Sequence, residues 1–357
     1  MLPLFTKRLL HWNKKENQRE MPWKGEKDPY RIWLSEIILQ QTRVEQGWNY
    51  YLKFIAAFPS VAHLAGATET KVFKLWEGLG YYSRCKNLIA AARIIDKEFG
   101  GRFPNQYEEI LSLPGIGPYT AAAIASFAYN LPYAVVDGNV QRVLARYAGI
   151  TIAVDSAPGR TAVNNLAVEW LDKKRPGEYN QAIMDFGALV CKPKSPACSE
   201  CMLKNSCRAY QLKRVAELPV RQKKIVKKSR WLYYFLVWHQ NQVYIRKRTG
   251  EDIWQNLHEF FLVEEARPLS KPNWHNHPSV STWFNRSGAA VTAVSKLYTR
   301  QLTHQTLHGQ FIEVTTETTP CLGAEFKAIP LSELDRYPFP KFIITYLQEK
   351  NVNLSQH

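Results

Sequence analysis

The sequence lacks any apolar run near the length of about 20 residues that is needed to cross a bilayer. Its N-terminal stretch breaks short apolar pieces with Lys7, Arg8 and Lys14, so the uninterrupted apolar core of a secretory signal is missing as well. No segment recurs at a period of roughly 20 to 50 residues, which excludes a solenoid of repeats. We therefore expect a globular protein of the cytoplasm that does not interact with membranes.

Acidic residues are also scarce. Asp and Glu number 31 against 47 Lys and Arg, which gives a formal net charge of +16 over 357 residues. An excess of positive charge of this size favours a polyanionic partner, and its sign fits both a nucleic acid and an anionic membrane surface. The chain is long enough for two domains, each with a core of its own.

The periodicity of the apolar residues changes along the chain. In the first part it follows the 3.6-residue helical period, with one long helix predicted over 31–58. Residues 216–230 belong to a basic segment and are predicted to be a linker. After the linker the pattern is that of strands, with a closing helix over 341–349. We predict a mainly α domain over 1–215 and a smaller α+β domain over 231–357.

Cysteine is uncommon too, with six in the whole chain, but four of them are grouped. The segment CKPKSPACSECMLKNSC has the spacing C-x6-C-x2-C-x5-C, at Cys191, Cys198, Cys201 and Cys207. In a reducing compartment such a group is typical of a metal centre, either a zinc ion with four thiolates or an iron–sulfur cluster. Zinc sites usually combine two C-x2-C pairs across a longer loop, a pattern that this segment does not follow.

The segment LPGIGPYTAAAI places Gly115 and Gly117 between two predicted helices. Both glycines can adopt positive φ, which lets backbone N–H groups converge at the start of the next helix. Such a turn binds a backbone phosphate without depending on the base sequence. A tight turn without a ligand is the simpler interpretation of a bare G-x-G, but the flanking leucine, proline and alanine-rich helix are typical of a helix-hairpin-helix motif.

Two carboxylates stand in unusual surroundings. Glu36, in WLSEIILQQT, lies at the edge of a buried helical stripe, where a glutamate is either solvated or lines a cleft. Asp137, in AVVDGNVQRVLARY, follows a short apolar run and precedes a helix, so it is either an ordinary N-cap or a functional carboxylate.

In combination, these features resemble the iron–sulfur branch of the helix-hairpin-helix DNA glycosylases. Within that branch the chain is identified as a member of the adenine DNA glycosylase family. The resemblance implies a [4Fe–4S] cluster, rather than zinc, on the four cysteines. It extends from about residue 5 to residue 207, continues more weakly to the end, and rests on DPYRIWLSEIILQQTRV, GLGYYSR, LPGIGPYTAAAI, VVDGNVQRV and NQAIMDFGALVC.

The resemblance implies a monofunctional enzyme of base excision repair that removes adenine mispaired with 8-oxoguanine or guanine from double-stranded DNA. Glu36 is then the acid that protonates a ring nitrogen of the flipped adenine, and burial beside Trp33 is expected to raise its pKa. Asp137 stabilises the oxocarbenium-like sugar, or bonds to it transiently, before water attacks. Tyr119 and Asn139 match positions that orient the aspartate and the sugar.

The resemblance also implies which residues surround the DNA. Lys24 stands where the family usually has arginine, so the charge is kept but the planar fork is lost. Tyr81 is expected to wedge into the base stack. The implied adenine pocket consists of Arg19, Trp23, Lys24, Leu39, Gln41, Val44 and Gln181. The implied contacts to the opposing lesion and the DNA are Thr42, Leu79, Tyr81, Gly115, Gly117, Leu302, Thr303 and His304. Gln41 is expected to contact the lesion base as well as the adenine.

Residues 231–357 resemble the Nudix-like domain with which the family recognises 8-oxoguanine. They lack the R-E-x-x-E-E-x-G run of metal-binding glutamates, so we expect the fold without pyrophosphatase activity. Leu302, Thr303 and His304 match the family's F-S-H loop, with Leu302 in place of the usual phenylalanine.

Two alternatives remain at this stage. A bifunctional glycosylase and lyase for oxidised pyrimidines needs a lysine just after the hairpin, where this chain has Pro118, Tyr119 and Thr120. A non-catalytic iron–sulfur damage sensor has no need for both Glu36 and Asp137. We expect a monomer that is associated with the nucleoid.

Overall fold

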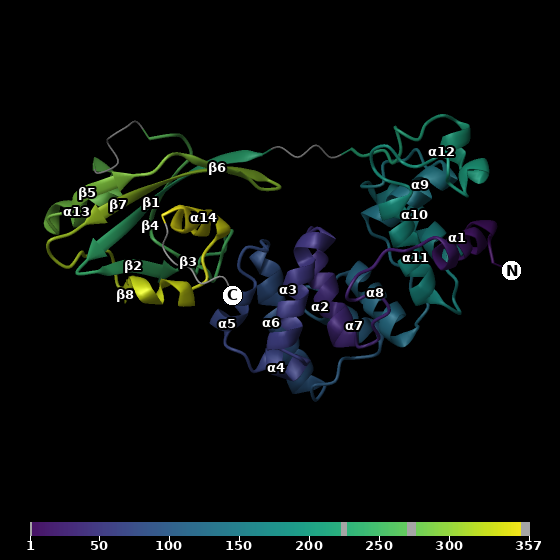
Figure 1. The fold of residues 1–357 in the computed structure, drawn as a ribbon, viewed down its shortest axis with the longest axis horizontal. Coiled ribbons are helices and arrows are strands. Elements are labelled where there is room, and N and C mark those ends of the chain that lie inside the picture. Colours follow the sequence, from purple (N-terminus) through teal and green to yellow (C-terminus); the bar gives the residue numbers. More distant parts are fainter. Residues whose placement is uncertain (1, 223–226, 270–275, 351–357) are drawn as a thin grey trace. The chain divides into compact units, whose positions relative to one another are not determined.

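The computed structural model describes residues 2–222, 227–269 and 276–350, which form two compact units (Figure 1). The first unit comprises 2–66 and 87–222, and the second comprises 67–86 together with the described residues from 227 onward. Within the predicted linker, 223–226 lie outside the described residues. The same holds for 270–275 and 351–357 of the predicted second domain.

The first unit is helical, as its apolar periodicity predicts. Its 3-10 turn, η1, spans Lys204–Ser206 beside the cysteines. The helices are α1 (Leu4–Lys15), α2 (Pro29–Leu39), α3 (Val44–Ala57), α4 (Val61–Ala65), the larger part of α6 (Tyr82–Glu98), α7 (Tyr107–Ser112), α8 (Pro118–Tyr129), α9 (Gly138–Ala148), α10 (Ala157–Trp170), α11 (Pro176–Leu189) and α12 (Arg208–Gln211).

The core of the first unit fixes where α8, α9 and α11 lie. Phe5 and Leu9 from α1, Leu144 from α9, and Tyr179 and Ile183 from α11 belong to one buried cluster. Helix α11 packs against both α8 and α9, and α2 packs against α8. The first turns of α8 and α9 are thereby held near the side chains that α2 and α11 present.

The long helix predicted over 31–58 is wrong, because the chain breaks it into α2 and α3. Gln41 has a φ of +56°, in the left-handed region, and the backbone N–H of Thr42 donates to Leu39 over 3.1 Å. Polar residues at 40–43 fit the solvent flank of a continuous helix equally well, so periodicity gave no sign of the turn. The break presents Gln41 and Thr42 from a turn instead of a helix face.

The second unit is an eight-stranded sheet with helices, which confirms the α+β prediction. The main path of the sheet is β3-β2-β1-β7-β5, while β4, β6 and β8 pair with β1, β7 and β2. Its elements are α5 (Glu69–Leu75), β1 (Lys228–His239), β2 (Gln242–Lys247), β3 (His258–Glu259), β4 (Phe261–Glu265), α13 (Pro278–Arg286), β5 (Ala290–Val294), β6 (Tyr298–Gln301), β7 (Gln305–Thr315), β8 (Lys327–Pro330), the 3-10 turn η3 (Leu331–Arg336) and α14 (Lys341–Glu349).

Strand β1 runs parallel to β7 through the middle of this sheet and is buried on both faces. Alternate residues such as Tyr234 pack in one cluster with Phe342 of α14, whereas their neighbours, such as Phe235, pack with Trp283 of α13. Burial on both sides explains why the segment WLYYFLVW is a continuous apolar run without polar alternation.

Residues 67–86 group with the second unit, although the predicted boundary lies far after them. The Glu77 carboxylate accepts a hydrogen bond from the backbone N–H of Phe339 over 2.8 Å and one from Lys74 Nζ over 2.9 Å. Lys74 also lies 3.5 Å from the carbonyl oxygen of Tyr337. A boundary drawn from sequence periodicity cannot detect such contacts between distant segments.

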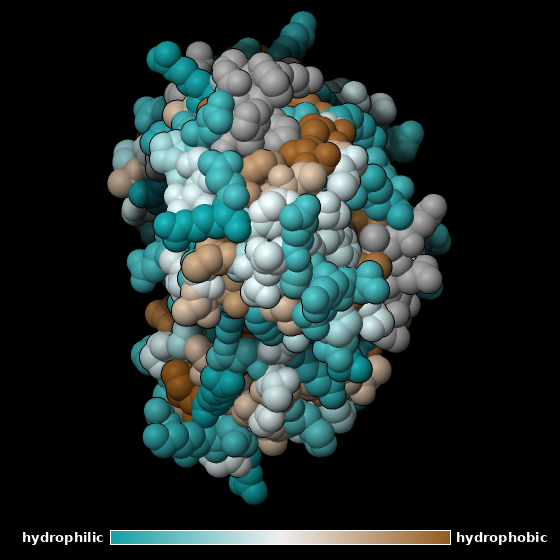
Figure 2. Space-filling view, turned by 90° about the vertical axis from the view of Figure 1, so that its left-hand side faces the viewer, coloured by the Kyte–Doolittle hydropathy of each residue, from teal (hydrophilic) through white to brown (hydrophobic). Residues whose placement is uncertain are grey.

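Hydrophilic side chains predominate on the face in Figure 2, and the hydrophobic residues visible there form small, separate groups. Two of the exposed large apolar side chains, Val291 and Val294, belong to the edge strand β5. In the part of the chain that the structure describes, no helix is both long and apolar enough to span a bilayer.

Candidate active site

A cavity of about 760 Å³ opens in the first unit among α2, α8, α9 and α11. Its lining comes from segments far apart in the sequence. It includes all the predicted catalytic and adenine-pocket residues and one predicted lesion contact, namely Arg19, Trp23, Lys24, Glu36, Leu39, Gln41, Thr42, Val44, Tyr119, Asp137, Asn139 and Gln181.

Glu36 lies on α2 at the wall of this cavity and is 8% exposed. Its burial raises the pKa of the carboxyl to about 7; a hydrogen bond with Tyr119 opposes this rise, and the nearby charge of Asp137 adds to it. A substantial fraction of Glu36 is therefore protonated near neutral pH. Of the two interpretations open from the sequence, the structure supports a glutamate that lines a cleft.

Asp137 is the N-cap of α9 and lines the cavity as well. Its carboxylate accepts hydrogen bonds from the backbone N–H of Val140 and from Nδ2 of Asn139, each over 2.7 Å. Burial raises its pKa, and these hydrogen bonds oppose the rise by stabilising the ionised form. The capping and functional interpretations are thus compatible, because one oxygen caps the helix while the side chain still borders the cavity.

Asn139 connects Asp137 to Arg142, a buried residue that the sequence analysis did not single out. Arg142 Nη2 donates to the side-chain oxygen of Asn139 over 2.8 Å, and its Nε donates to the carbonyl oxygen of Cys191 over 2.7 Å. A continuous path of hydrogen bonds therefore joins the cavity to the cysteine segment. The arginine in VVDGNVQRV is the one sequence signal for it, through its i,i+3 spacing from Asn139.

The four predicted metal ligands Cys191, Cys198, Cys201 and Cys207 line one small pocket of the first unit. Arg146 lies between two of them. Its Nη1 is 3.5 Å from the Cys191 sulfur, and its carbonyl oxygen is 3.5 Å from the Cys207 sulfur. Within the described ranges no three side chains of His, Cys, Asp or Glu converge closely enough to hold a single metal ion.

The turn before α8 differs in part from its prediction. Gly115 has a φ of +76°, and a Cβ there would lie 2.6 Å from the Cβ of Asn87, so glycine is required. Gly117 does not adopt positive φ: it is the N-cap of α8 with a φ of −95°, and the prediction was wrong for this residue. A Cβ at Gly117 would point into open space, so close packing does not require glycine at this position.

The remaining predicted lesion contacts lie in the second unit. Tyr81 is 43% exposed with a φ of +47°, whereas Leu79 and Tyr82 are buried. The Tyr81 hydroxyl forms a hydrogen bond of 2.5 Å with the hydroxyl of Thr303. Thr303 belongs to the turn between β6 and β7 that also holds Leu302 and His304. The structure thus brings Tyr81 and Thr303 together from segments more than 200 residues apart in sequence.

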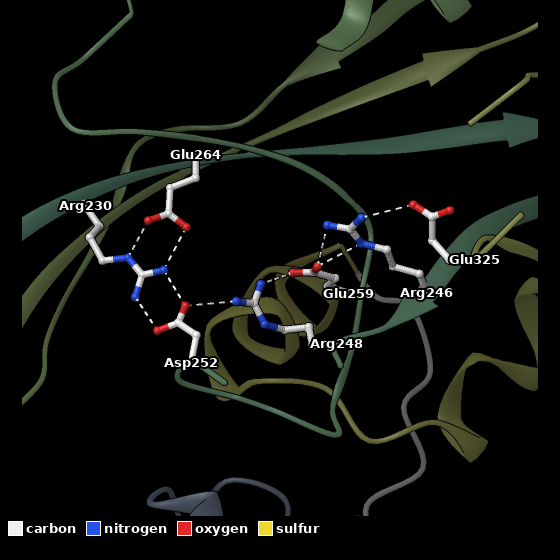
Figure 3. A network of polar contacts seen from close by, with 7 residues as sticks. All are labelled: Arg230, Arg246, Arg248, Asp252, Glu259, Glu264 and Glu325. Carbon is white, nitrogen blue, oxygen red and sulfur yellow. Dashed lines mark hydrogen bonds and ion pairs between the residues drawn. The ribbon is translucent and has the colours of Figure 1, made fainter. Parts of the chain in front are cut away.

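A network of arginines and carboxylates joins β1–β4 of the second unit to the loop before β3 (Figure 3). Arg230 pairs with Asp252 and Glu264, at 2.5 and 2.6 Å. Arg248 pairs with Asp252 and Glu259, and Arg246 pairs with Glu259 and Glu325. Because every carboxylate drawn there faces an arginine, this network stabilises the unit and offers no ready ligands to a metal ion.

Two family models match successive parts of the chain. A model of the HhH-GPD superfamily of base excision DNA repair proteins matches residues 34–170, and a NUDIX domain model matches residues 233–349. The adenine DNA glycosylase of Buchnera aphidicola subsp. Baizongia pistaciae (strain Bp) is 32% identical over 313 residues, which are 85% of this chain and 84% of that protein. The adenine DNA glycosylase of Mus musculus is 42% identical over 220 residues, 58% of this chain and 42% of the mouse protein.

Solved structures resemble the helical part. A thermostable thymine-DNA glycosylase aligns with a TM-score of 0.55 and 29% identity, covering 58% of this chain and 96% of its own. An endonuclease III trapped on DNA as a covalent intermediate aligns with a TM-score of 0.51 and 19% identity over 60% of this chain and 99% of its own, which shows the fold alone. The predicted fold class, a helix-hairpin-helix domain followed by a smaller Nudix-like α+β domain, is confirmed.

Proposed function

Because this chain belongs to the adenine DNA glycosylases, and is therefore a DNA glycosylase of base excision repair that acts on DNA, we propose that it hydrolyses the N-glycosidic bond of adenine mispaired with 8-oxoguanine or guanine. The observation that carries this proposal is the pair of carboxyl groups on one cavity, Glu36 with a raised pKa and Asp137 held by two hydrogen bonds. A protein that merely sensed damage would not need both groups there.

In the proposed mechanism the protonated carboxyl of Glu36 donates its proton to a ring nitrogen of an adenine flipped into the cavity. Protonation turns the base into a better leaving group, so the glycosidic bond breaks toward a cationic, oxocarbenium-like sugar. The ionised carboxylate of Asp137 then stabilises that cation until water attacks the anomeric carbon. Glu36 and Asp137 thus act in opposite protonation states.

The lysines of the cavity support hydrolysis over lyase chemistry. Lys24 and Lys27 line it within the described residues. Lys24 Nζ donates to the carbonyl oxygen of Arg19 over 2.7 Å and pairs with Asp185 at 3.3 Å, while Lys27 Nζ donates to the carbonyl oxygen of Phe127 over 3.0 Å. A Schiff-base nucleophile must be a neutral amine that is free to reach the sugar. We therefore propose a monofunctional enzyme.

Replacing Tyr119 with phenylalanine is expected to shift the alkaline limb of the pH–rate profile upward. The Tyr119 hydrogen bond lowers the pKa of Glu36, so its loss raises that pKa further, by about one unit for a hydrogen bond of ordinary strength to a charged group. Single-turnover rates of adenine release between pH 6 and pH 10 measure the shift. An alkaline limb at the wild-type position would contradict a contact between Tyr119 and Glu36 in the active complex.

For the lesion opposite the adenine, we propose recognition by Leu79, Tyr81, Leu302, Thr303 and His304. The hydrogen bond between Tyr81 and Thr303 supports joint action of the two segments of the second unit. The second unit is not proposed to be a pyrophosphatase. Helix α13, whose sequence is PSVSTWFNR, carries no carboxylate that could serve as a metal ligand.

We propose that the four cysteines bind a [4Fe–4S] cluster. The four cysteines line one pocket, and their spacing C-x6-C-x2-C-x5-C does not follow the two C-x2-C pairs that are usual for zinc. When bound, the cluster would supply four iron–thiolate bonds that hold the segment from Cys191 to Cys207 together. Arg146 and Arg142 would then hold that segment against α9 through their hydrogen bonds.

Purified protein is expected to contain about four iron and four sulfide ions per chain. Replacing Cys198 with serine should reduce both, whereas replacing the exposed Cys321, which lies in the other unit, should reduce neither. Chemical analysis of iron, sulfide and zinc measures these quantities. One zinc ion per chain, with no iron, would contradict the proposal.

The proposed substrate is tested by the rate at which free adenine is released from duplexes that differ in the base opposite a single adenine. We expect release opposite 8-oxoguanine and guanine, and much slower release opposite thymine. Equal rates opposite all three bases would contradict recognition of the opposing base. We expect the enzyme to act as a monomer, with the N-terminus of α8 binding a DNA phosphate.

A further inference from the structure

Asp185 is a fully buried carboxylate on α11, and polar side chains reach it from the connection between α1 and α2 and from α11 itself. Asn17 Nδ2 donates to it over 2.8 Å, Arg19 Nη1 over 2.8 Å and Gln181 Nε2 over 3.0 Å. Lys24 Nζ lies 3.3 Å from Oδ2, the oxygen that also accepts from Asn17, whereas Arg19 and Gln181 donate to Oδ1. The sequence analysis did not single out this residue, although it stands four positions after Gln181 in NQAIMDFGALVC.

Three of these four partners border the cavity where the flipped base is proposed to lie, namely Arg19, Lys24 and Gln181. Each of these three side chains points one N–H group at the Asp185 carboxylate, so the carboxylate determines which of their other polar atoms remain free to contact a ligand. The side chains of Arg19 and Lys24 are 23% and 28% exposed, whereas that of Asp185 is fully buried. The two cations thus line the cavity and pair with a carboxylate that lies behind them.

The Asp185 carboxylate constrains Gln181 most strongly, because the amide of Gln181 can present either a donor or an acceptor to the cavity. An ionised carboxylate only accepts, so it selects the orientation in which the amide nitrogen of Gln181 faces Asp185. The carbonyl oxygen then remains to accept from the base. Adenine carries an exocyclic amine at position 6, which donates, whereas 6-oxopurines carry an acceptor there.

We infer that Asp185 is a positioning residue that fixes the Gln181 amide and the two cations, and thereby makes the base pocket selective for a 6-aminopurine. This inference rests on the proposed function and adds the source of its base specificity. Without the carboxylate, Gln181 is free to rotate its amide, and Arg19 and Lys24 lose their common counter-ion.

The test compares the release of adenine with the release of hypoxanthine, its 6-oxo counterpart, from duplexes with 8-oxoguanine opposite. For Asp185→Asn we expect the preference for adenine to fall by about tenfold or more, the discrimination of one well-placed hydrogen-bonding pair. We also expect weaker binding of a duplex with 2′-fluoro-2′-deoxyadenosine, whose bond resists cleavage, while binding of an abasic-site analogue changes little. A preference that stays at the wild-type value overturns the inference.

Asp172→Asn is the matched control, because Asp172 is also a buried carboxylate in an ion pair, but its partner Arg175 does not line the cavity. A merely structural role of Asp185 predicts that both variants weaken both duplexes alike and keep the preference for adenine. That result would also overturn the inference.

Since Asp185→Asn leaves two cations without their counter-ion, a charge-balanced variant guards against misfolding. Asp185→Asn combined with Lys24→Met removes one charge of each sign, and Lys24→Met alone is its reference. The double variant is expected to lose the preference for adenine relative to that reference, and equal preferences would contradict the inference. The rate of adenine release by the wild type tests the proposed function separately. A wild type that releases adenine, together with variants that keep the preference for adenine, would overturn the role of Asp185 and leave the proposed function standing.

Discussion

Replacing Glu36 with glutamine is expected to slow adenine release by about 10²- to 10⁴-fold, the range typical of a lost general acid. Glutamine keeps the size and polarity of the side chain but has no acidic proton to transfer. Binding of the mispaired duplex should stay within a few-fold of wild type. Single-turnover release of adenine and a binding titration measure the two effects separately.

Glu45→Gln serves as the matched control, because Glu45 is exposed in the first turn of α3 and does not line the cavity. Its rate should equal that of wild type. If Glu36→Gln released adenine within threefold of wild type, Glu36 would not be the acid, whatever its pKa.

The stability of the same variant gives an independent check with a definite sign. In the unfolded chain Glu36 titrates near its ordinary pKa of 4.5, whereas burial raises the pKa to about 7 in the folded chain. The contribution of Glu36 to the free energy of unfolding is therefore fully present below pH 4.5 and is lost as the pH rises through 7. The total loss is at most about 3 kcal/mol. Glu36→Gln should therefore melt at a higher temperature than wild type at pH 8, with the difference vanishing near pH 4. A lower melting temperature at pH 8 would instead indicate damage to the fold.

Replacing Asp137 with asparagine is expected to slow adenine release by about 10²- to 10³-fold, as for other lost electrostatic contacts to a transition state. Asparagine accepts the hydrogen bond of Val140 as an N-cap almost as well as aspartate does, so α9 should persist. What disappears is the negative charge opposite the cationic sugar. Rates at several pH values should lie lower throughout, and the alkaline limb of Glu36 should move to lower pH, because the charge of Asp137 contributes to the raised pKa of Glu36.

Asp28→Asn is the control for this variant, because Asp28 is likewise an aspartate N-cap, accepting from the backbone N–H of Tyr30 over 2.9 Å. Both variants should retain their helices by circular dichroism, and the Asp137 variant alone should lose activity. An equal loss in both would mean that helix capping, and not the charge at the sugar, explains the effect of Asp137.

The sequence offered the candidate catalytic residues directly, because they stand in motifs such as WLSEIILQQT and VVDGNVQRV. Glu36 and Asp137 lie on one cavity in the structure, as the resemblance implied. Asp185 was not predictable in the same way. A lone aspartate in an apolar helix has no pattern of its own, and its importance lies in partners from Asn17 to Gln181 that only the fold assembles.

Local backbone geometry was also not predictable from the sequence. The break at Gln41 and the extended φ of Gly117 depend on packing around the cavity and the hairpin, to which apolar periodicity is insensitive. In the second unit the buried strand β1 was evident from its apolar run, whereas the exposed edge strands β5 and β6 were not. Edge strands bury too little to leave a clear alternation in sequence.

The most direct test of the account is a single-turnover reaction on a duplex with adenine opposite 8-oxoguanine, analysed for strand scission with and without alkali. The account predicts free adenine in solution, scission of the adenine strand only after alkali, and neither product with Glu36→Gln. Scission without alkali would reveal an amine nucleophile and contradict the monofunctional mechanism. Tight binding of the duplex by wild type with no release of adenine would contradict the proposed substrate.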